Sequence, residues 1–486
     1  MNKKTVLYFL GPPLLLVPIV AFFDLTLSIG ICMLVFLSAL TLISLMFFKV
    51  EDNKLYTLFF VSLVLHVLVV LFLQYSHFQP FSDGIGDYTI YNSEAQTALA
   101  SFLGGNFSLS GVSLTTYFPV LIAFVYFFTV PKMLIGVLFA AFLGAITAVL
   151  VFLMVKELGG SGKQSFLTGL VTNFYASYMF YGSLLLRDII IIPLAVFGLW
   201  LIIRMAKRFL WVDFFLLYLV LAAEFQLRIY IGYAVLLSFV VCFVFLSVFT
   251  LKRKIIYALI IIPILGFLPQ ISGYGYYGSN FLEQYLNPKT VALYQNLYNP
   301  ASPLSLSPSV PSSSSSQVAL QELQKKVRPS APVVKPASGY PVISPQPVSK
   351  GLDSSFVVNI DKRSPVTFVV SYLKYFCYIL LGPFPWQMSS PRQYFAFLET
   401  IPWYFLLFFV AKGILGSLKS KNRLIIPLLV FGLSALVALA VYVSNFGIIT
   451  RIRIPAFISL LCLAPLAFIK KGEEKQKKHV RYSGNY

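Results

Sequence analysis

The chain has 486 residues, of which 58% are hydrophobic and only 11% are charged, and its mean hydropathy is +0.83. No soluble domain of this length could bury so much apolar surface, so the composition predicts an all-α polytopic membrane protein with the lipid bilayer as its solvent. The formal net charge is +20, but many Lys and Arg residues stand in short clusters between apolar runs. That pattern indicates membrane topology and argues against a nucleic-acid partner.

Twelve apolar runs are long enough to cross the hydrocarbon core. If the N-terminus is cytoplasmic, every basic cluster between them falls on the cytoplasmic side, as the positive-inside rule requires. We therefore expect a multi-pass bundle of about 12 transmembrane helices with both termini in the cytoplasm. The expected spans are 6–23, 27–48, 55–74, 133–155, 164–183, 188–205, 209–226, 229–250, 255–271, 399–415, 424–443 and 454–470.

The spans divide the chain into six segments. Two further apolar stretches, 117–130 and 366–381, are placed on the outer face as interfacial or re-entrant segments, because crossing there would move basic clusters outside. Ser/Pro-rich sequence at 302–316 and 329–350 predicts a disordered tether. The segments are a three-span N-terminal part (1–74), a first extracytoplasmic loop with juxtamembrane helices (75–132), a six-span core (133–271), a second extracytoplasmic loop (272–398), a three-span C-terminal part (399–470) and a basic cytoplasmic tail (471–486).

The first outer loop carries the acidic residues of most interest, Asp83, Asp87 and Glu94. From Asp87 onward, Tyr91, Ala95 and Leu99 recur every four residues, which predicts one face of a short helix near the membrane surface. Asp87 then lies at the N-terminus of that helix, where free amide donors favour a carboxylate. A plain helix-capping role for Asp87 is the alternative to a catalytic one.

Several arginines are expected on the outer face, where the positive-inside rule disfavours them. Arg451 and Arg453 precede the last predicted span, and Arg187 and Arg228 stand at the outer ends of two others. Phosphate binding would explain them, since guanidinium groups recognise phosphate oxygens. Headgroup anchoring is the alternative for the first two, and structural pairing with Asp188 or Glu224 is the alternative for Arg187 and Arg228.

Other chemistry finds little support in the sequence. No pair among His66, His77 and His479 has metal-ligand spacing, and the four cysteines form no metal or redox motif. Phosphate-binding loops, dinucleotide fingerprints and nucleophile elbows are not found. No acidic residue falls in the middle of a predicted span, which disfavours an ion-coupled transporter.

A series of short motifs resembles the GT-C superfamily of membrane glycosyltransferases. The likeness is greatest to the bacterial branch akin to protein mannosyltransferases and the aminoarabinose transferase of lipid A. It extends from Asp83 to Phe468, and the order of the motifs carries it. They are Gly86-Asp87 with Tyr91 and Ala95, the run 117–123, Lys156 to Gly159, the aromatic run 173–183 leading to Asp188, Arg228 to Gly232, Pro383 to Trp386, and Arg451 to Pro455.

The resemblance implies a polyprenyl-phosphate- or polyprenyl-diphosphate-linked sugar as co-substrate and a glycan, lipid or protein acceptor outside a plasma membrane. It makes Asp87 the catalytic aspartate, with Asp83 as second choice. No other cofactor follows from it, and the need for a divalent metal stays open. Ile231 departs from the pattern, because relatives carry an acid there. The expected site combines phosphate-binding Arg451, Arg453, Arg228 and Arg187 with supporting Asp188, Tyr91 and Glu94.

Two other functions are compatible with the sequence. An O-antigen-type polymerase or ligase also has many spans and basic outer loops, and a large ordered outer domain with several arginines would favour it. A lipid-linked-oligosaccharide flippase or a non-catalytic polysaccharide-export scaffold is the third alternative. A cationic cavity through the spans would favour the flippase, and the predicted spans carry almost no charges.

Overall fold

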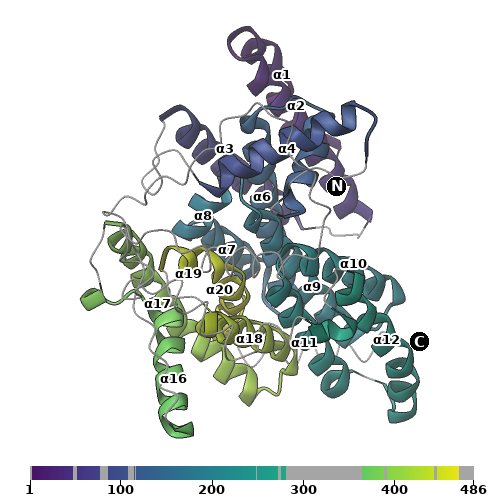
Figure 1. Ribbon diagram of the computed structural model, residues 1–486, viewed down its shortest axis with the longest axis vertical. Helices are drawn as coiled ribbons and strands as arrows, with labels where there is room; N and C mark the ends of the chain where they lie inside the picture. Colours follow the sequence, from purple (N-terminus) through teal and green to yellow (C-terminus); the bar gives the residue numbers. More distant parts are fainter. Residues whose placement is uncertain are drawn as a thin grey trace, which may run out of the picture.

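The structure is a computed structural model that describes residues 3–47, 52–76, 86–107, 114, 116–247, 249–271, 275–280, 364–387, 391–442 and 446–469. Within these ranges every regular element is a helix. The tether predicted at 302–316 and 329–350, and the second candidate base Asp83, lie outside the described residues. Figure 1 shows helices α1 to α4 gathered at one end of the molecule and α9 to α12 and α16 to α18 at the other.

The helices of the first half run from the N-terminus to residue 271. They are α1 (Lys3–Phe23), α2 (Leu25–Phe47), α3 (Asn53–Ser76), α4 (Asp87–Leu103), α5 (Phe118–Phe127), α6 (Met133–Glu157), α7 (Gly162–Asn173), α8 (Ala176–Gly182), α9 (Asp188–Lys207), α10 (Trp211–Leu227), α11 (Ile229–Leu246) and α12 (Leu251–Ile271). The later elements are η1 (Tyr276–Gly278), α16 (Pro365–Leu381), η3 (Pro385–Gln387), α17 (Pro391–Lys419), η4 (Arg423–Ile425), α18 (Ile426–Tyr442), α19 (Phe446–Ile452), α20 (Ile454–Leu461) and η5 (Ala464–Phe468).

Seven helical stretches in the described part of the chain are long and apolar enough to cross a membrane. Their number and composition confirm the all-α polytopic class, because a helix satisfies its own backbone hydrogen bonds in lipid. The count of twelve spans and the side on which the termini lie stay predictions. The seven are Leu25–Met46, Asn53–Ser76, Met133–Glu157, Asp188–Lys207, Ile229–Leu246, Glu399–Lys419 and Arg423–Ala440.

Two of the expected spans are interrupted in the structure. The stretch 164–183 is divided into α7 and α8, and Tyr175 between them has extended backbone angles. The stretch 454–470 is divided into α20 and η5, and Pro465 stands near the start of the second piece. Proline cannot donate a backbone hydrogen bond within a helix, which accounts for the second interruption. Apolar composition alone predicts burial in lipid and does not predict these breaks.

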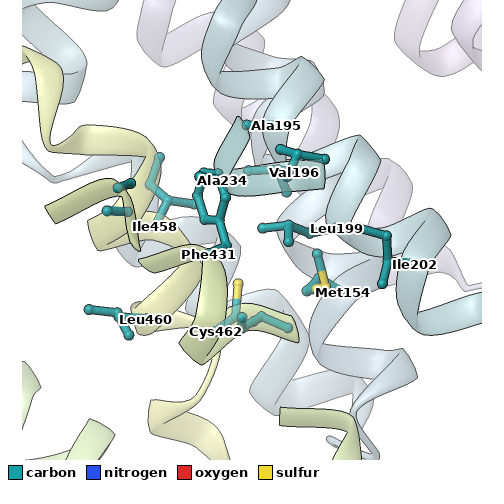
Figure 2. Close-up of a cluster of buried hydrophobic side chains, with 14 of the residues drawn as sticks. Met154, Ala195, Val196, Leu199, Ile202, Ala234, Phe431, Ile458, Leu460 and Cys462 are labelled. Atoms are coloured by element: carbon teal, nitrogen blue, oxygen red, sulfur yellow. The ribbon is translucent and has the colours of Figure 1, made fainter. Parts of the chain in front are cut away.

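Two clusters of buried apolar side chains hold the helices together. One joins α3, α4, α5 and α6, and the other joins α6, α9, α11, α18 and α20. Figure 2 shows the second cluster, in which Phe431 of α18 and Ile458 of α20 lie beside Ala234 of α11 and Leu199 of α9. Because α6 contributes to both clusters, it links the N-terminal helices to the rest of the molecule.

Charged residues at one end of α6 and α9 tie neighbouring helices together. Lys156 pairs with Asp52 at 3.2 Å, Lys207 pairs with Glu157, and Arg204 lies 3.4 Å from Asp213. All six residues belong to helix ends that the charge pattern assigns to the cytoplasmic face. Asp188 begins α9, so it stands about 30 Å from this end of the bundle at the helical rise per residue.

Candidate functional site

Helix α4 presents Asp87 at its first turn. Gly86 precedes it as the N-cap with extended backbone angles, and Tyr91, Ala95 and Leu99 are buried along one side of the helix. This confirms the helical face predicted from the four-residue spacing. The cap position belongs to Gly86, however, so Asp87 is not the capping residue, and its carboxylate accepts a hydrogen bond from Arg451 instead.

Arg451 of α19 joins two carboxylates that are far apart in the sequence. Its Nη1 donates to Oδ2 of Asp87 at 2.9 Å, and its Nε donates to Oδ2 of Asp188. The Asp87 side chain is 53% exposed, whereas that of Arg451 is 16% exposed. Burial disfavours the charge of Arg451, but Asp188 and Asp87 outweigh burial and raise the pKa of the guanidinium above its ordinary value. Arg451 is therefore a permanent cation beside an accessible carboxylate.

Asp188 is held by two arginines at once. Its Oδ1 lies 2.7 Å from Nη1 of Arg228, and its Oδ2 accepts from Arg451. Arg228 stands between α10 and α11, where its Nη1 also donates to the hydroxyl of Tyr230 at 3.2 Å. Burial works against the charge of Arg228, and the attraction of Asp188 raises the pKa of the guanidinium despite it. Asp188 thereby fixes both cations at the N-terminus of α9.

Arg187 has donor capacity left over. Its Nη1 makes one long bond of 3.4 Å to the backbone carbonyl of Leu227, and its Nε is buried with no hydrogen-bond partner among the residues that the structure describes. Burial lowers the pKa of this guanidinium, and repulsion from Arg228 adds to that effect. An arginine carries five N–H donors, so an anion with several oxygens is the ligand that suits the unused ones.

Tyr91 stands at the edge of this charged group. Burial raises the pKa of its phenol, while Arg187 opposes the rise and Asp87 adds to it. The phenol therefore keeps its proton at neutral pH and remains a hydrogen-bond donor. Glu94 lies three residues beyond Tyr91 in α4 and is half-buried, and its supporting role stays a prediction.

Glu224 is a buried acid next to the cluster that the expected site did not include. It is 0% exposed, and in the described part of the chain neither of its carboxylate oxygens has a hydrogen-bond partner. The sequence offers one signal for it, because Glu224 precedes Arg228 by four residues, a spacing at which side chains on a helix are neighbours. Arg228 nevertheless pairs with Asp188, which decides between the two acids that the sequence left open.

Arg453 does not join Arg451, although both were expected to bind one phosphate. Its side chain is 0% exposed, and its Nη1 donates to the carbonyls of Ile379 at 3.0 Å and Gly382 at 2.7 Å. Its Nη2 lies 3.3 Å from Oε1 of Glu399. Residues two apart on a helix point about 200° apart, so one arginine faces the exposed carboxylate and the other faces the interior. The expected four-arginine site therefore becomes a three-arginine site with a separate buried pair.

We name the residues Asp87, Arg187, Asp188, Arg228 and Arg451 the carboxylate–arginine cluster. It draws on α4, the start of α9, the α10–α11 junction and α19. The described residues contain no group of three or more His, Cys, Asp or Glu side chains arranged for a metal ion. No protein-family model matches the chain, and a search of curated proteins finds no match. The fold and cluster together define a helical, membrane-type protein with a partly exposed group of paired carboxylates and arginines.

Proposed function

We propose that the chain is an integral membrane glycosyltransferase of the GT-C type, which moves a sugar from a polyprenyl-phosphate or polyprenyl-diphosphate carrier to a glycan, lipid or protein on the extracytoplasmic face. One observation carries the proposal: Arg451 bridges Asp87 and Asp188, while the Nε of Arg187 has no hydrogen-bond partner among the described residues. The cluster thus combines a carboxylate open to solvent with cations suited to a phosphate, which are the two groups that this transfer requires.

Asp87 acts as the general base in this mechanism. An acceptor hydroxyl gives its proton to the Asp87 carboxylate as its oxygen forms a bond to the anomeric carbon of the donor sugar. The bond between that carbon and the carrier phosphate breaks, and the phosphate leaves with the bonding electrons. A positioned base contributes roughly 10²–10⁴-fold in rate. The 53% exposure of the Asp87 side chain leaves room for an acceptor to approach.

Arg451 and Arg187 stabilise the departing phosphate. Asp188 accepts from Nε of Arg451, so the guanidinium keeps its orientation when a phosphate oxygen replaces Asp87 at Nη1. Arg187 supplies its Nε donor, which has no partner within the described part of the chain. Because these groups face charge that grows as the sugar–phosphate bond breaks, they favour the transition state over the bound donor.

The test is a transfer assay on purified protein in lipid nanodiscs. We would supply a panel of sugars linked to polyprenyl monophosphate or diphosphate, together with candidate acceptors, and measure release of the carrier phosphate. The proposal predicts release from at least one donor and a much slower, still measurable release in Arg451→Ala. Donor binding with no release from any member of the panel would support the flippase or scaffold hypothesis instead.

A further inference from the structure

A second charged group lies inside the protein, and the proposed reaction does not use it. Arg453 and Glu399 have side chains that are 0% and 4% exposed. The Nη1 of Arg453 donates to the carbonyl of Ile379 in the last turn of α16 and to that of Gly382, the residue just after this helix. The ring of Phe457 lies beneath the guanidinium, 4.6 Å from its carbon to the ring centroid.

Glu399 extends this group to another helix. Its Oε1 accepts from Arg453, and its Oε2 accepts from the backbone amide of Ser177 at 2.6 Å. Ser177 lies in the first turn of α8, just after the interruption between α7 and α8. The pair therefore connects four parts of the molecule: the start of α8, the end of α16, the first half of α17 and the junction of α19 with α20.

The backbone between Arg453 and Arg451 is continuous and helical. The Arg453 amide donates to the carbonyl of Ile449 at 3.0 Å, and the Phe457 amide donates to the carbonyl of Arg453 at 3.0 Å. A shift of Arg453 is therefore transmitted directly to Arg451, two residues earlier. One arginine holds this segment from the interior, and the other faces Asp87 and Asp188.

We infer that Arg453 and Glu399 are positioning residues, which fix α19 so that Arg451 meets Asp87 and Asp188, and that they do not bind the carrier phosphate themselves. This inference rests on the proposed function for its effect on transfer. Stability alone gives no reason for the pair, because a well-packed apolar pair of similar volume is often as stable as a buried ion pair. A guanidinium instead offers donors in fixed directions, and two backbone carbonyls and one carboxylate use them here.

A double-mutant cycle separates positioning from general stability. Arg453→Lys keeps the charge beside Glu399, but one ammonium group cannot reproduce the planar fork that spans three acceptors. We expect it to lower turnover about 10–100-fold through misplacement of Arg451. In the Arg451→Ala background the same substitution should cost less than about twofold, because the group through which it acts is gone.

Arg204→Lys is the matched control at the opposite end of the bundle. Arg204 also combines an ion pair, at 3.4 Å to Asp213, with an aromatic ring 4.6 Å away, that of Trp200. The effect of Arg204→Lys on turnover should add to that of Arg451→Ala. Additive effects for Arg453→Lys, or loss of transfer only in proportion to loss of folded protein, would overturn the inference. Should Arg453→Lys fail to fold, Glu399→Gln takes its place in the same cycle with the same expected non-additivity.

A structural readout does not depend on sugar transfer. A cryo-EM structure of Arg453→Lys should show that Nη1 of Arg451 has left Oδ2 of Asp87, from which it is 2.9 Å away in the native chain. An unchanged contact would refute positioning. If the native chain releases carrier phosphate from no donor, the proposed function fails, whereas the inference about Arg453 is still decided by this structure.

Discussion

Asp188 holds the candidate site together, because each of its carboxylate oxygens meets a different arginine. Its side chain is 5% exposed and that of Arg228 is 6% exposed, so water cannot replace either partner. Asp188→Asn should leave one buried guanidinium facing an amide nitrogen and cost about 3–5 kcal/mol in the free energy of unfolding. A lowered thermal unfolding temperature in detergent, with loss of monodisperse protein, would be the measured result.

Glu224→Gln is the control for this prediction. It is the same change from carboxyl to amide in a buried position nearby, but neither oxygen of Glu224 has a hydrogen-bond partner among the described residues, so none of their bonds is lost. The free energy of unfolding should change by less than about 1 kcal/mol. Equal destabilisation by the two substitutions would show that Asp188 is not the special member of the pair.

Sequence reasoning found the members of the cluster but could not pair them. Charge on a predicted outer segment singled out each member of the carboxylate–arginine cluster, and the structure brings these residues together. Arg453 was grouped with Arg451 because the two are neighbours in sequence. A spacing of two residues does not show which of the two arginines is buried. The burial of Arg453 depends on its contacts with α16 and α17, which are distant in the chain.

At the scale of helices, close packing of α17 against the C-terminal segment depends on a glycine. A methyl group added at Gly413 would lie 2.1 Å from the carbonyl oxygen of Leu463, which is backbone and cannot turn aside. Gly413→Ala should therefore force the two segments apart and destabilise the protein by about 1–3 kcal/mol. Thermal unfolding followed by intrinsic fluorescence would measure it.

Gly416→Ala provides the comparison within the same helix. Its nearest neighbour would be the carbonyl oxygen of Leu466 at 3.8 Å, an ordinary contact. The substitution should be neutral or stabilise the helix by up to about 1 kcal/mol, as alanine favours helix more than glycine does. Comparable losses at the two positions would mean that the approach of α17 to Leu463 is looser than the structure shows.

The helices differ in how well the sequence predicted them. The buried face of α4 followed from one spacing, because a short amphipathic helix has a single core-facing side. The interrupted segments α7–α8 and α20–η5 did not, because both halves are apolar and hydropathy averages across the break. The Asn173 amide donates to Ser62 at the first break, a contact between residues 111 positions apart that no local pattern reveals.

For the whole molecule, charge pattern and packing agree on which helix ends share a side. Residues that the positive-inside rule assigns to the cytoplasm pair with one another, as Lys156 does with Asp52. The carboxylate–arginine cluster lies at the other end of α9. The pairing was not deducible from sequence, because the rule sorts loops by side and does not say which helices are neighbours.

Thiol labelling tests the orientation of the whole bundle. The two exposed cysteines, Cys32 and Cys377, would first be changed to Ala. In that background one variant would carry a cysteine in place of the exposed Thr97 of α4, and a second variant would carry one in place of the exposed Lys163 of α7. An impermeant reagent applied to intact cells should label the Thr97→Cys chain and label the Lys163→Cys chain only after permeabilisation. The reverse pattern would invert the topology and place the cluster in the cytoplasm.

The most direct test of the account is carrier-phosphate release by Asp87→Asn. Asparagine keeps the size of the side chain and an oxygen that can accept from Arg451, so expression and thermal stability should stay near those of the native chain. Because the amide cannot take the acceptor proton, release should fall roughly 10²–10⁴-fold, whereas Asp83→Asn should reduce it less. A native rate of release in Asp87→Asn together with an inactive Asp83→Asn would make Asp83 the general base. Native rates in both variants would contradict the glycosyltransferase mechanism.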